Sequence, residues 1–185
     1  MCGTGEEIAV ARLSELLALE CGMHSNIAKI VGVSAYFHDV GKVFVPDRIL
    51  QKPGPLSPAE VEQVKYHTIH GAKLLGVLPN KLRKPAQDIA LWHHERFDGG
   101  GYWNKYTCEL PLYVSLVAIA DVFVALTSVR VYKCSWPVCE ALDYIGDNSG
   151  THFNPLLVKL FITMIQKDCC VSALFKGGVP HSRRC

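Results

Sequence analysis

The sequence predicts an all-α fold, a compact helical bundle of about seven helices. Three observations lead to this class: apolar residues recur at helical spacing along most of the chain, residues that begin or end helices separate these segments, and no confident β-strand remains. At 185 residues, with 49% hydrophobic and 19% charged residues, the chain is long and apolar enough to bury the core of a single domain.

The first two helices are expected over residues 8–21 and 25–37. Apolar residues follow the helical repeat through the first segment, and Gly22 occupies the place of the glycine that commonly ends a helix. The side-chain oxygen of Ser25 can cap the N-terminus of the second segment. A short turn is therefore expected to join two neighbouring helices.

Clearer start signals mark the next two helices. Ser57, Pro58 and Glu60 form the pattern of a capping box with proline at the first helical position, so a helix is expected from there to about Leu75. A fourth helix is expected over residues 85–94, with a proline at its start and a glycine-rich loop soon after its end.

Three more helices complete the predicted bundle, over 112–128, over 136–146 and after Asn154. The one β-like run, residues 43–49, contains Pro46 and Asp47, so an extended loop is expected there. We expect residues 1–175 to form the single domain and residues 176–185 to form a flexible basic tail.

Charge and hydropathy exclude several classes of protein. The net charge of +2 is too small for a protein that binds a nucleic-acid polymer. The most apolar stretch, residues 111–126, is interrupted by Asp121, so no membrane span is expected. The N-terminus lacks the basic segment of an export signal, and the eight scattered cysteines form no C-x-x-C pair. A cytoplasmic protein with reduced thiols is therefore expected, and a disulfide between some of the cysteines is the alternative.

The histidines suggest where the chemistry lies, because five of the eight fall into three local groups. The groups are His38 beside Asp39, His67 with His70 one turn later, and His93 beside His94. Asp121 lies inside a long apolar run, where a buried carboxylate needs a cation or another partner. Since helices can bring such groups together in a bundle core, we expect a metal centre. The alternative is that these are ordinary core or surface histidines, and an exposed or capping role is open for His70.

The donor set indicates which metals and which reaction to expect. Imidazoles with two carboxylates and no thiolate group suit Fe or Mn, with Zn as a further candidate, better than Mg or Ca. One carboxylate could bridge two divalent ions, and such a pair can activate a hydroxide for in-line attack on phosphorus. The expected reaction is hydrolysis of a phosphoester.

These motifs resemble those of the HD-GYP subgroup of the HD-domain phosphohydrolases over about residues 8–165. The segments that carry the resemblance are HDVGK at 38–42, VPDRIL at 45–50, His67 followed by Gly71, HHERFDGGGY at 93–102, ADVF at 120–123 with TSVRVYK at 127–133, and GTHFNP at 150–155. The resemblance implies a helical bundle that hydrolyses cyclic di-GMP to the linear dinucleotide pGpG, to GMP or to both, through a hydroxide that bridges two metal ions.

The resemblance also implies roles for individual residues. The implied metal ligands are His38, Asp39, His67, His93, His94 and Asp121. Asp39 would bridge the ions, and Lys42 would act beside it as a catalytic residue that approaches a phosphate or the leaving oxygen. The implied substrate-binding residues are Lys42, Gly101, Tyr102, Arg130 and Lys133. A solvated surface charge is the alternative for the three cations, and packing of the glycine loop is the alternative for Tyr102.

Departures from the family pattern leave other functions open. The N-terminal ligands of the family would fall at Glu6 and Cys2, so two metal ions are expected rather than three, with Glu6 or water completing the site. Trp103 replaces the proline of the GYP signature, and Asn154 replaces an aspartate. The alternatives to a phosphodiesterase are a module that binds nucleotide or a signalling protein through the glycine loop with little turnover, and an HD-type nucleotidase.

Overall fold

The computed structural model describes residues 4–128 and 135–167, and within these ranges the chain forms helices, turns and loops without a β-strand. The predicted all-α class is confirmed. The α-helices are α1 (Thr4–Glu20), α2 (Ser25–Tyr36), α3 (Asp47–Leu50), α4 (Pro58–Leu74), α5 (Asn80–Trp92), α6 (Leu112–Thr127), α7 (Val138–Asp147) and α8 (Pro155–Lys167). Three 3-10 helices are η1 (Val40–Phe44), η2 (Leu75–Val77) and η3 (Thr107–Glu109).

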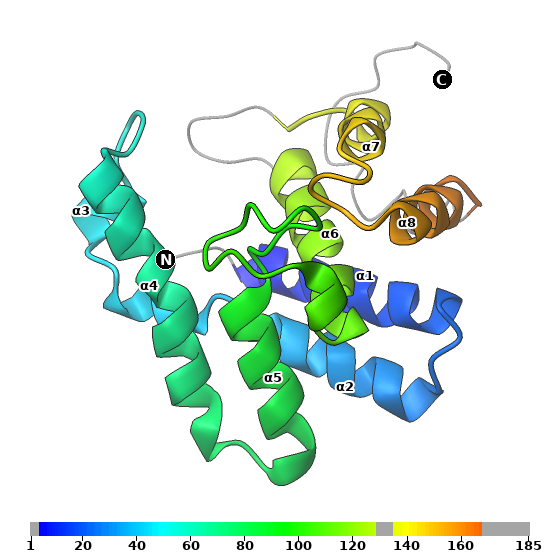
Figure 1. The fold of residues 1–185 in the computed structure, drawn as a ribbon, viewed down its shortest axis with the longest axis horizontal. Coiled ribbons are helices and arrows are strands. Elements are labelled where there is room, and N and C mark those ends of the chain that lie inside the picture. Colours follow the sequence, from blue (N-terminus) through cyan, green and yellow to red (C-terminus); the bar gives the residue numbers. More distant parts are fainter. Residues whose placement is uncertain (1–3, 129–134, 168–185) are drawn as a thin grey trace.

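The helices pack in pairs around α6. Helices α1 and α2 form one pair, α4 and α5 form a second, and α2 joins the two by packing on α5. Helix α6 packs on α1, while α7 and α8 pack on each other and on α6. Figure 1 shows α3 and α4 on one side of the bundle and α7 and α8 on the other, with α6 between them.

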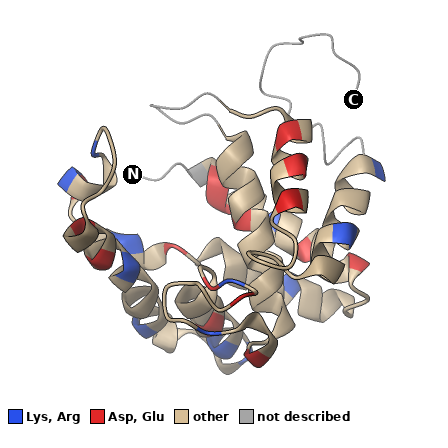
Figure 2. Ribbon diagram, turned by 45° about the horizontal axis from the view of Figure 1, so that its top comes forward, with Lys and Arg blue, Asp and Glu red and all other residues tan. Residues whose placement is uncertain are grey.

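The core is apolar and has α6 at its centre. Residues 114–120 of α6 are all buried. The rings of Phe123 of α6 and Phe161 of α8 meet edge to face at 5.2 Å, and Leu13 and Leu17 of α1 are fully buried. Figure 2 shows both Lys or Arg and Asp or Glu on the surface of the bundle. Within the described ranges, no helix is both long enough and apolar enough to cross a lipid bilayer.

Two of the predicted helix ends occur as expected. Gly22 has a φ of 79°, and the N–H of Met23 donates to the carbonyl of Ala18 at 3.0 Å, so a glycine turn ends α1. At α4, the N–H of Ser57 donates to Glu60 Oε2 (2.7 Å), and the N–H of Glu60 donates to Ser57 Oγ (3.3 Å). This reciprocal pair is the predicted capping box.

Two predicted helix starts were wrong. The cap of α2 is His24, whose Nδ1 accepts the N–H of Asn26 at 3.3 Å, and Ser25 is already helical. Helix α5 begins at Asn80 rather than Pro85, which lies inside the helix. The missing N–H of Pro85 costs one hydrogen bond near the N-terminus, and the burial of the following turns outweighs it.

The expected extended loop over 43–49 was also wrong. Residues 40–44 form η1, and 47–50 form the single turn of α3, so only a short extended link separates them. The carbonyl of Pro46 accepts the N–H of Ile49 at 2.8 Å, which shows that this proline starts a turn of helix. The proposed tail over 176–185 lies outside the described residues, and the single-domain boundary stays a prediction.

Gly41 and Gly71 allow η1 to lie directly on α4. A Cβ atom added to Gly41 would overlap the backbone carbonyl of His67 and would lie 2.5 Å from the backbone nitrogen of Gly71. A Cβ atom on Gly71 would in turn lie 3.3 Å from the nitrogen of Gly41. The two glycines therefore set the distance between the segment that follows His38 and the helix that carries His67.

We expect Gly41→Ala to lower the free energy of unfolding by about 1–3 kcal/mol, because overpacking against backbone forces the two segments apart. For a chain of this length, the melting temperature should fall by roughly 2–12 °C. Gly5→Ala is the control, since no atom lies within 4 Å of the added Cβ atom. Equal melting temperatures for the two variants would contradict the close contact.

Candidate metal centre

Four separate segments carry the predicted ligands into the interior of the bundle. His38 and Asp39 lie in the turn between α2 and η1, His67 lies in α4, His93 and His94 follow α5, and Asp121 lies in α6. The structure places these side chains in two groups, each with ligand atoms within 4.8 Å of one another. The groups are Asp39, His67, His93 and His94, and His38, His93 and Asp121. His70, which was left open as a candidate, is in neither group.

Backbone carbonyls orient the histidine rings. Nδ1 of His38 donates to the carbonyl of Ala35 at 2.7 Å, and Nδ1 of His67 donates to that of Val64 at 2.6 Å. Nδ1 of His93 likewise donates to the carbonyl of Ile89, one turn earlier in α5, at 3.0 Å. A carbonyl can only accept, so Nδ1 carries a proton, and Nε2 is the ring atom that faces the centre and offers a lone pair when the ring is neutral. This is the arrangement that commonly orients histidines for metal binding.

The carboxylate of Asp39 lies among these lone pairs. Its Oδ1 is 3.2 Å from Nε2 of His67 and 3.7 Å from Nε2 of His93, and it is buried without a hydrogen-bond donor. The two Nε2 atoms are 3.5 Å apart, close to the spacing of about 3.0–3.4 Å expected for two nitrogen ligands at about 2.1 Å from one ion. Lone pairs that face one another repel, so a bound cation would stabilise this arrangement, and the donor set fits a divalent metal.

Burial and charge set the protonation of the imidazoles. Burial opposes the charged form of His38, but the carboxylates of Asp39 and Asp121, each 3.4 Å from its Nε2, raise its pKa well above the usual value. Burial lowers the pKa of His93, and burial together with the charge of His93 lowers the pKa of His94 further. His93 and His94 are thus held in the neutral form, in which imidazole binds metals.

Asp39 offers its two oxygens to different groups of ligands. Oδ1 faces His67 and His93, whereas Oδ2 faces His38, which also lies beside Asp121. Burial alone would raise the pKa of both carboxyls, but the interactions with His38 hold each pKa well below its usual range. Both carboxylates are therefore charged. His93 belongs to both groups of ligands, and Asp39 lies between them with one oxygen toward each.

Lys42 and Tyr102 border the centre. Nζ of Lys42 forms an ion pair with Oδ2 of Asp39. The ring of Tyr102 lies 4.5 Å from the ring of His94, with an angle of 35° between the planes. Burial raises the pKa of the Tyr102 hydroxyl, so the group remains a hydrogen-bond donor at neutral pH. A Cβ atom on Gly101 would lie 2.5 Å from Cα of Glu95, which explains the glycine before Tyr102.

Other predicted site residues are absent from the two groups. Arg130 and Lys133 lie outside the described residues, so their roles in substrate binding stay predictions. Glu6 lies in α1 and belongs to neither group, and Cys2 lies outside the described residues.

Glu95 had no predicted role, yet only 1% of its surface is exposed. Its Oε1 accepts the N–H of Trp103 at 2.8 Å, and its Oε2 accepts the N–H of Lys105 at 2.7 Å. The ring N–H of Trp103 also donates to the hydroxyl of Thr68 in α4, at 3.1 Å. These bonds hold the glycine loop, and with it Tyr102, against the centre. An acidic residue just before a loop rich in backbone N–H groups is the sequence signal for this role.

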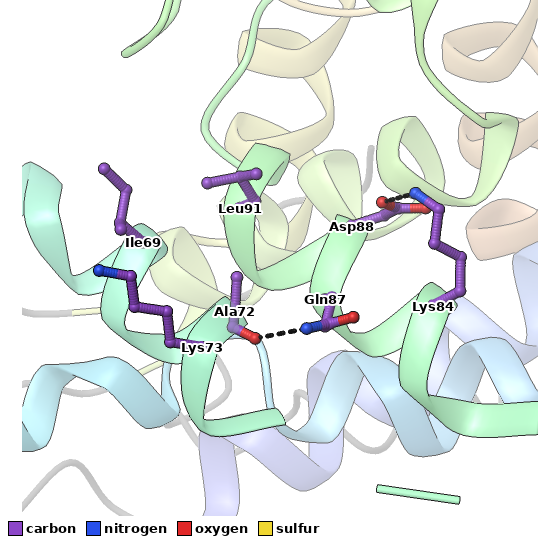
Figure 3. Close-up of a pocket in the computed structure, with 7 residues that line it drawn as sticks. All are labelled: Ile69, Ala72, Lys73, Lys84, Gln87, Asp88 and Leu91. Atoms are coloured by element: carbon purple, nitrogen blue, oxygen red, sulfur yellow. Dashed lines mark hydrogen bonds and ion pairs between the residues drawn. The ribbon is translucent and has the colours of Figure 1, made fainter. Parts of the chain in front are cut away.

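A groove of about 340 Å³ lies between α4 and α5 (Figure 3), and none of the predicted ligands lines it. Three of its four polar side chains already have protein partners. Lys84 pairs with Asp88, and Nε2 of Gln87 donates to the carbonyl of Ala72 at 2.9 Å. The other oxygen of Asp88 accepts the hydroxyl of Tyr113 at 2.6 Å, so this carboxylate ties α5 to α6. The groove therefore offers no reactive group comparable with the histidine centre.

Comparison with known proteins gives relatives over most of the chain. A family model described as "HD domain" matches residues 3–157. The chain is 35% identical over 177 residues to the cyclic di-GMP phosphodiesterase response regulator RpfG of Xanthomonas campestris pv. campestris, covering 95% of this chain and 43% of that protein. It is 39% identical over 156 residues to a cyclic di-GMP phosphodiesterase of Thermotoga maritima. This match covers 84% of this chain and 42% of that protein. It is 37% identical over 154 residues to 3′3′-cGAMP-specific phosphodiesterase 2 of Vibrio cholerae, covering 83% and 30%.

The chain therefore spans less than half the length of each of these relatives. Two solved structures share its fold. The HDG"Y"P protein Bd1817 of Bdellovibrio bacteriovorus has a TM-score of 0.68 at 21% identity, covering 87% of this chain and 51% of that chain. The PgpH HD domain of L. monocytogenes, in complex with cyclic-di-AMP, has a TM-score of 0.64 at 22% identity, covering 95% and 92%.

We expect His67→Gln to lose bound metal, because the variant removes one imidazole from the group around Asp39. The apparent metal affinity should weaken by more than the 10- to 100-fold that is typical of losing an outer partner. His70→Gln, one turn later on α4, is the matched control and should retain the metal. Elemental analysis of anaerobically purified protein and competition with a chelator provide the measurements. Equal metal content in the two variants would count against the assignment.

A second prediction concerns the loop. Glu95→Gln should place an amide NH₂ group against one of the two backbone N–H groups that the carboxylate now accepts, at a cost of about 1–3 kcal/mol. We expect faster hydrogen exchange at the amides of Trp103 and Lys105, measured by NMR or mass spectrometry. Glu109→Gln, at an exposed position, is the control. Unchanged protection of both amides in the Glu95 variant would show that the carboxylate does not hold the loop.

Proposed function

We propose that this chain, which belongs to the HD domain family, is a metal-dependent phosphodiesterase that hydrolyses cyclic di-GMP. One observation carries the proposal: a buried carboxylate oxygen of Asp39 without a donor faces the Nε2 lone pairs of His67 and His93. A cation must occupy such a position, and the donors suit the metals that serve phosphoester hydrolysis. The relatives named as cyclic-dinucleotide phosphodiesterases support the substrate class.

The two groups of ligands support a pair of divalent ions, Fe or Mn, with Zn as a further candidate. One ion would be held by His67, His93 and His94, and the other by His38 and Asp121, with His93 within reach of both. Asp39 would contribute one oxygen to each, since its Oδ1 and Oδ2 face different groups. Divalent ions supply Lewis acidity, which offsets charge that develops on a phosphoryl group.

The surrounding residues would bind and orient the phosphodiester. Lys42 has a compact ammonium charge beside Asp39, and this charge suits contact with a phosphate oxygen or with the leaving oxygen. Tyr102 presents a hydroxyl from the loop that packs on His94, and Gly101 lets this loop approach closely. The burial of the histidines excludes water from their side of the centre, where it would weaken electrostatic interactions.

The decisive test is product analysis on protein purified anaerobically and loaded with Fe(II) or Mn(II). Cyclic di-GMP should be converted to pGpG, to GMP or to both, as separated by chromatography. Lys42→Met should lower kcat by about 10²–10³-fold, because it removes one charge from the reacting phosphate, and should keep the metal. Lys73→Met, at an exposed position on α4, is the matched control.

Two outcomes would overturn the proposal. Tight binding of cyclic di-GMP without turnover in the metal-loaded protein would indicate a module that senses nucleotide. Release of phosphate from a mononucleotide, with cyclic di-GMP left intact, would indicate a nucleotidase.

A further inference from the structure

Four aromatic side chains form a continuous row beside the metal centre. The ring of Phe44 lies 5.0 Å from the ring of His70, which lies 6.3 Å from that of Tyr66. The ring of Tyr66 in turn lies 6.0 Å from that of Trp103. The row thus links η1, α4 and the glycine loop, three segments that are far apart in the sequence.

The row adjoins the centre at three points along the chain. Phe44 follows Lys42 by two residues, Tyr66 immediately precedes His67, and Trp103 immediately follows Tyr102. Its rings are therefore carried by the same short segments that carry a predicted ligand and two predicted substrate contacts.

Much of this aromatic surface remains open to solvent. Phe44 is 55% exposed and Tyr66 is 49% exposed, although burying such rings would stabilise the fold. Trp103 is only half-buried, yet its position is fixed, because its backbone and ring N–H groups donate to Glu95 and Thr68. The row therefore presents exposed aromatic surface, with Trp103 as a fixed member.

The charges near the row suit an anionic ligand with flat rings. Nζ of Lys65 lies 5.7 Å from the ring centroid of Tyr102, and Lys42 borders the centre on the side of η1. The four side chains of the row are aromatic, and none of them is a carboxylate. Nucleobases stack on such rings with about 1–3 kcal/mol per base, whereas their phosphates need neighbouring cations.

We propose that the row formed by Phe44, His70, Tyr66 and Trp103 is a stacking subsite for one purine base of a cyclic dinucleotide. The inference rests on the proposed function, because it assumes that the phosphate of this substrate lies at the metal centre. Tyr66 is the central member, with a ring neighbour on each side, and is a specificity-determining residue. Stacking identifies a base by its flat face, so the row favours a nucleotide over a diester without bases.

The first test uses binding and does not require turnover. Metal-loaded protein is titrated with a non-hydrolysable phosphorothioate cyclic dinucleotide in which 2-aminopurine replaces one base, and the fluorescence is followed. Stacking on the row should quench the probe, and Tyr66→Ala should weaken binding by about 5- to 150-fold, which corresponds to 1–3 kcal/mol. Tyr66→Phe should restore quenching, since it keeps the ring. Tyr36→Ala, which removes a tyrosine that is 40% exposed on α2, is the control.

The second test uses hydrolysis and separates the two proposals. With metal-loaded protein, Tyr66→Ala should raise KM for cyclic di-GMP and leave kcat within a few-fold, because stacking is the same in the ground state and the transition state. Absence of hydrolysis by the wild type would overturn the proposed function, while the fluorescence titration would still decide the subsite. Equal quenching and affinity for wild type and Tyr66→Ala would overturn the subsite alone.

Discussion

A buried carboxylate oxygen that faces imidazole lone pairs is the constraint on which the rest of the structure depends. Leaving such an oxygen without a cation costs several kcal/mol, and the same holds for the lone pairs opposite it. The bundle keeps these atoms together because each ring is fixed from behind by a carbonyl of its own segment. The helices thus hold the ligand atoms in place, and a metal ion bound between them would offset their mutual repulsion.

Some motif residues supply ligand atoms, and others set the distance between the segments that carry the ligands. Both kinds determine the geometry of the centre. Gly41 and Gly71 bear no functional group, yet their backbones touch and so bring Asp39 to His67. Helix α6 contributes in a different way. Its burial on nearly every side fixes its position, so that Asp121 reaches His38 from the apolar core. Ordinary packing therefore determines the geometry of a charged centre.

The sequence predicts the fold class and the grouping of the six ligand candidates better than it predicts local detail. Helical periodicity and clustered histidines are signals within one segment, and they gave the candidates. The resemblance to a known family favoured His67 over His70, and the structure brings the six implied ligands together. The cap at His24, the start of α5 at Asn80 and the turn of α3 depend on backbone hydrogen bonds and on burial from other segments. The role of Glu95 depends on amides eight and ten residues later, a relation that no helical repeat encodes.

The exchange of the signature proline for Trp103 illustrates how one constraint can replace another. A proline stiffens a loop through its fixed φ but has no N–H to donate. Trp103 lacks that stiffness, yet its backbone N–H reaches Glu95 and its ring N–H reaches Thr68, so two hydrogen bonds hold the same point of the loop. The loop is then fixed to α4, the helix that carries His67, and Tyr102 stays packed on His94. The substitution therefore changes how the loop is held and adds an aromatic face beside the centre.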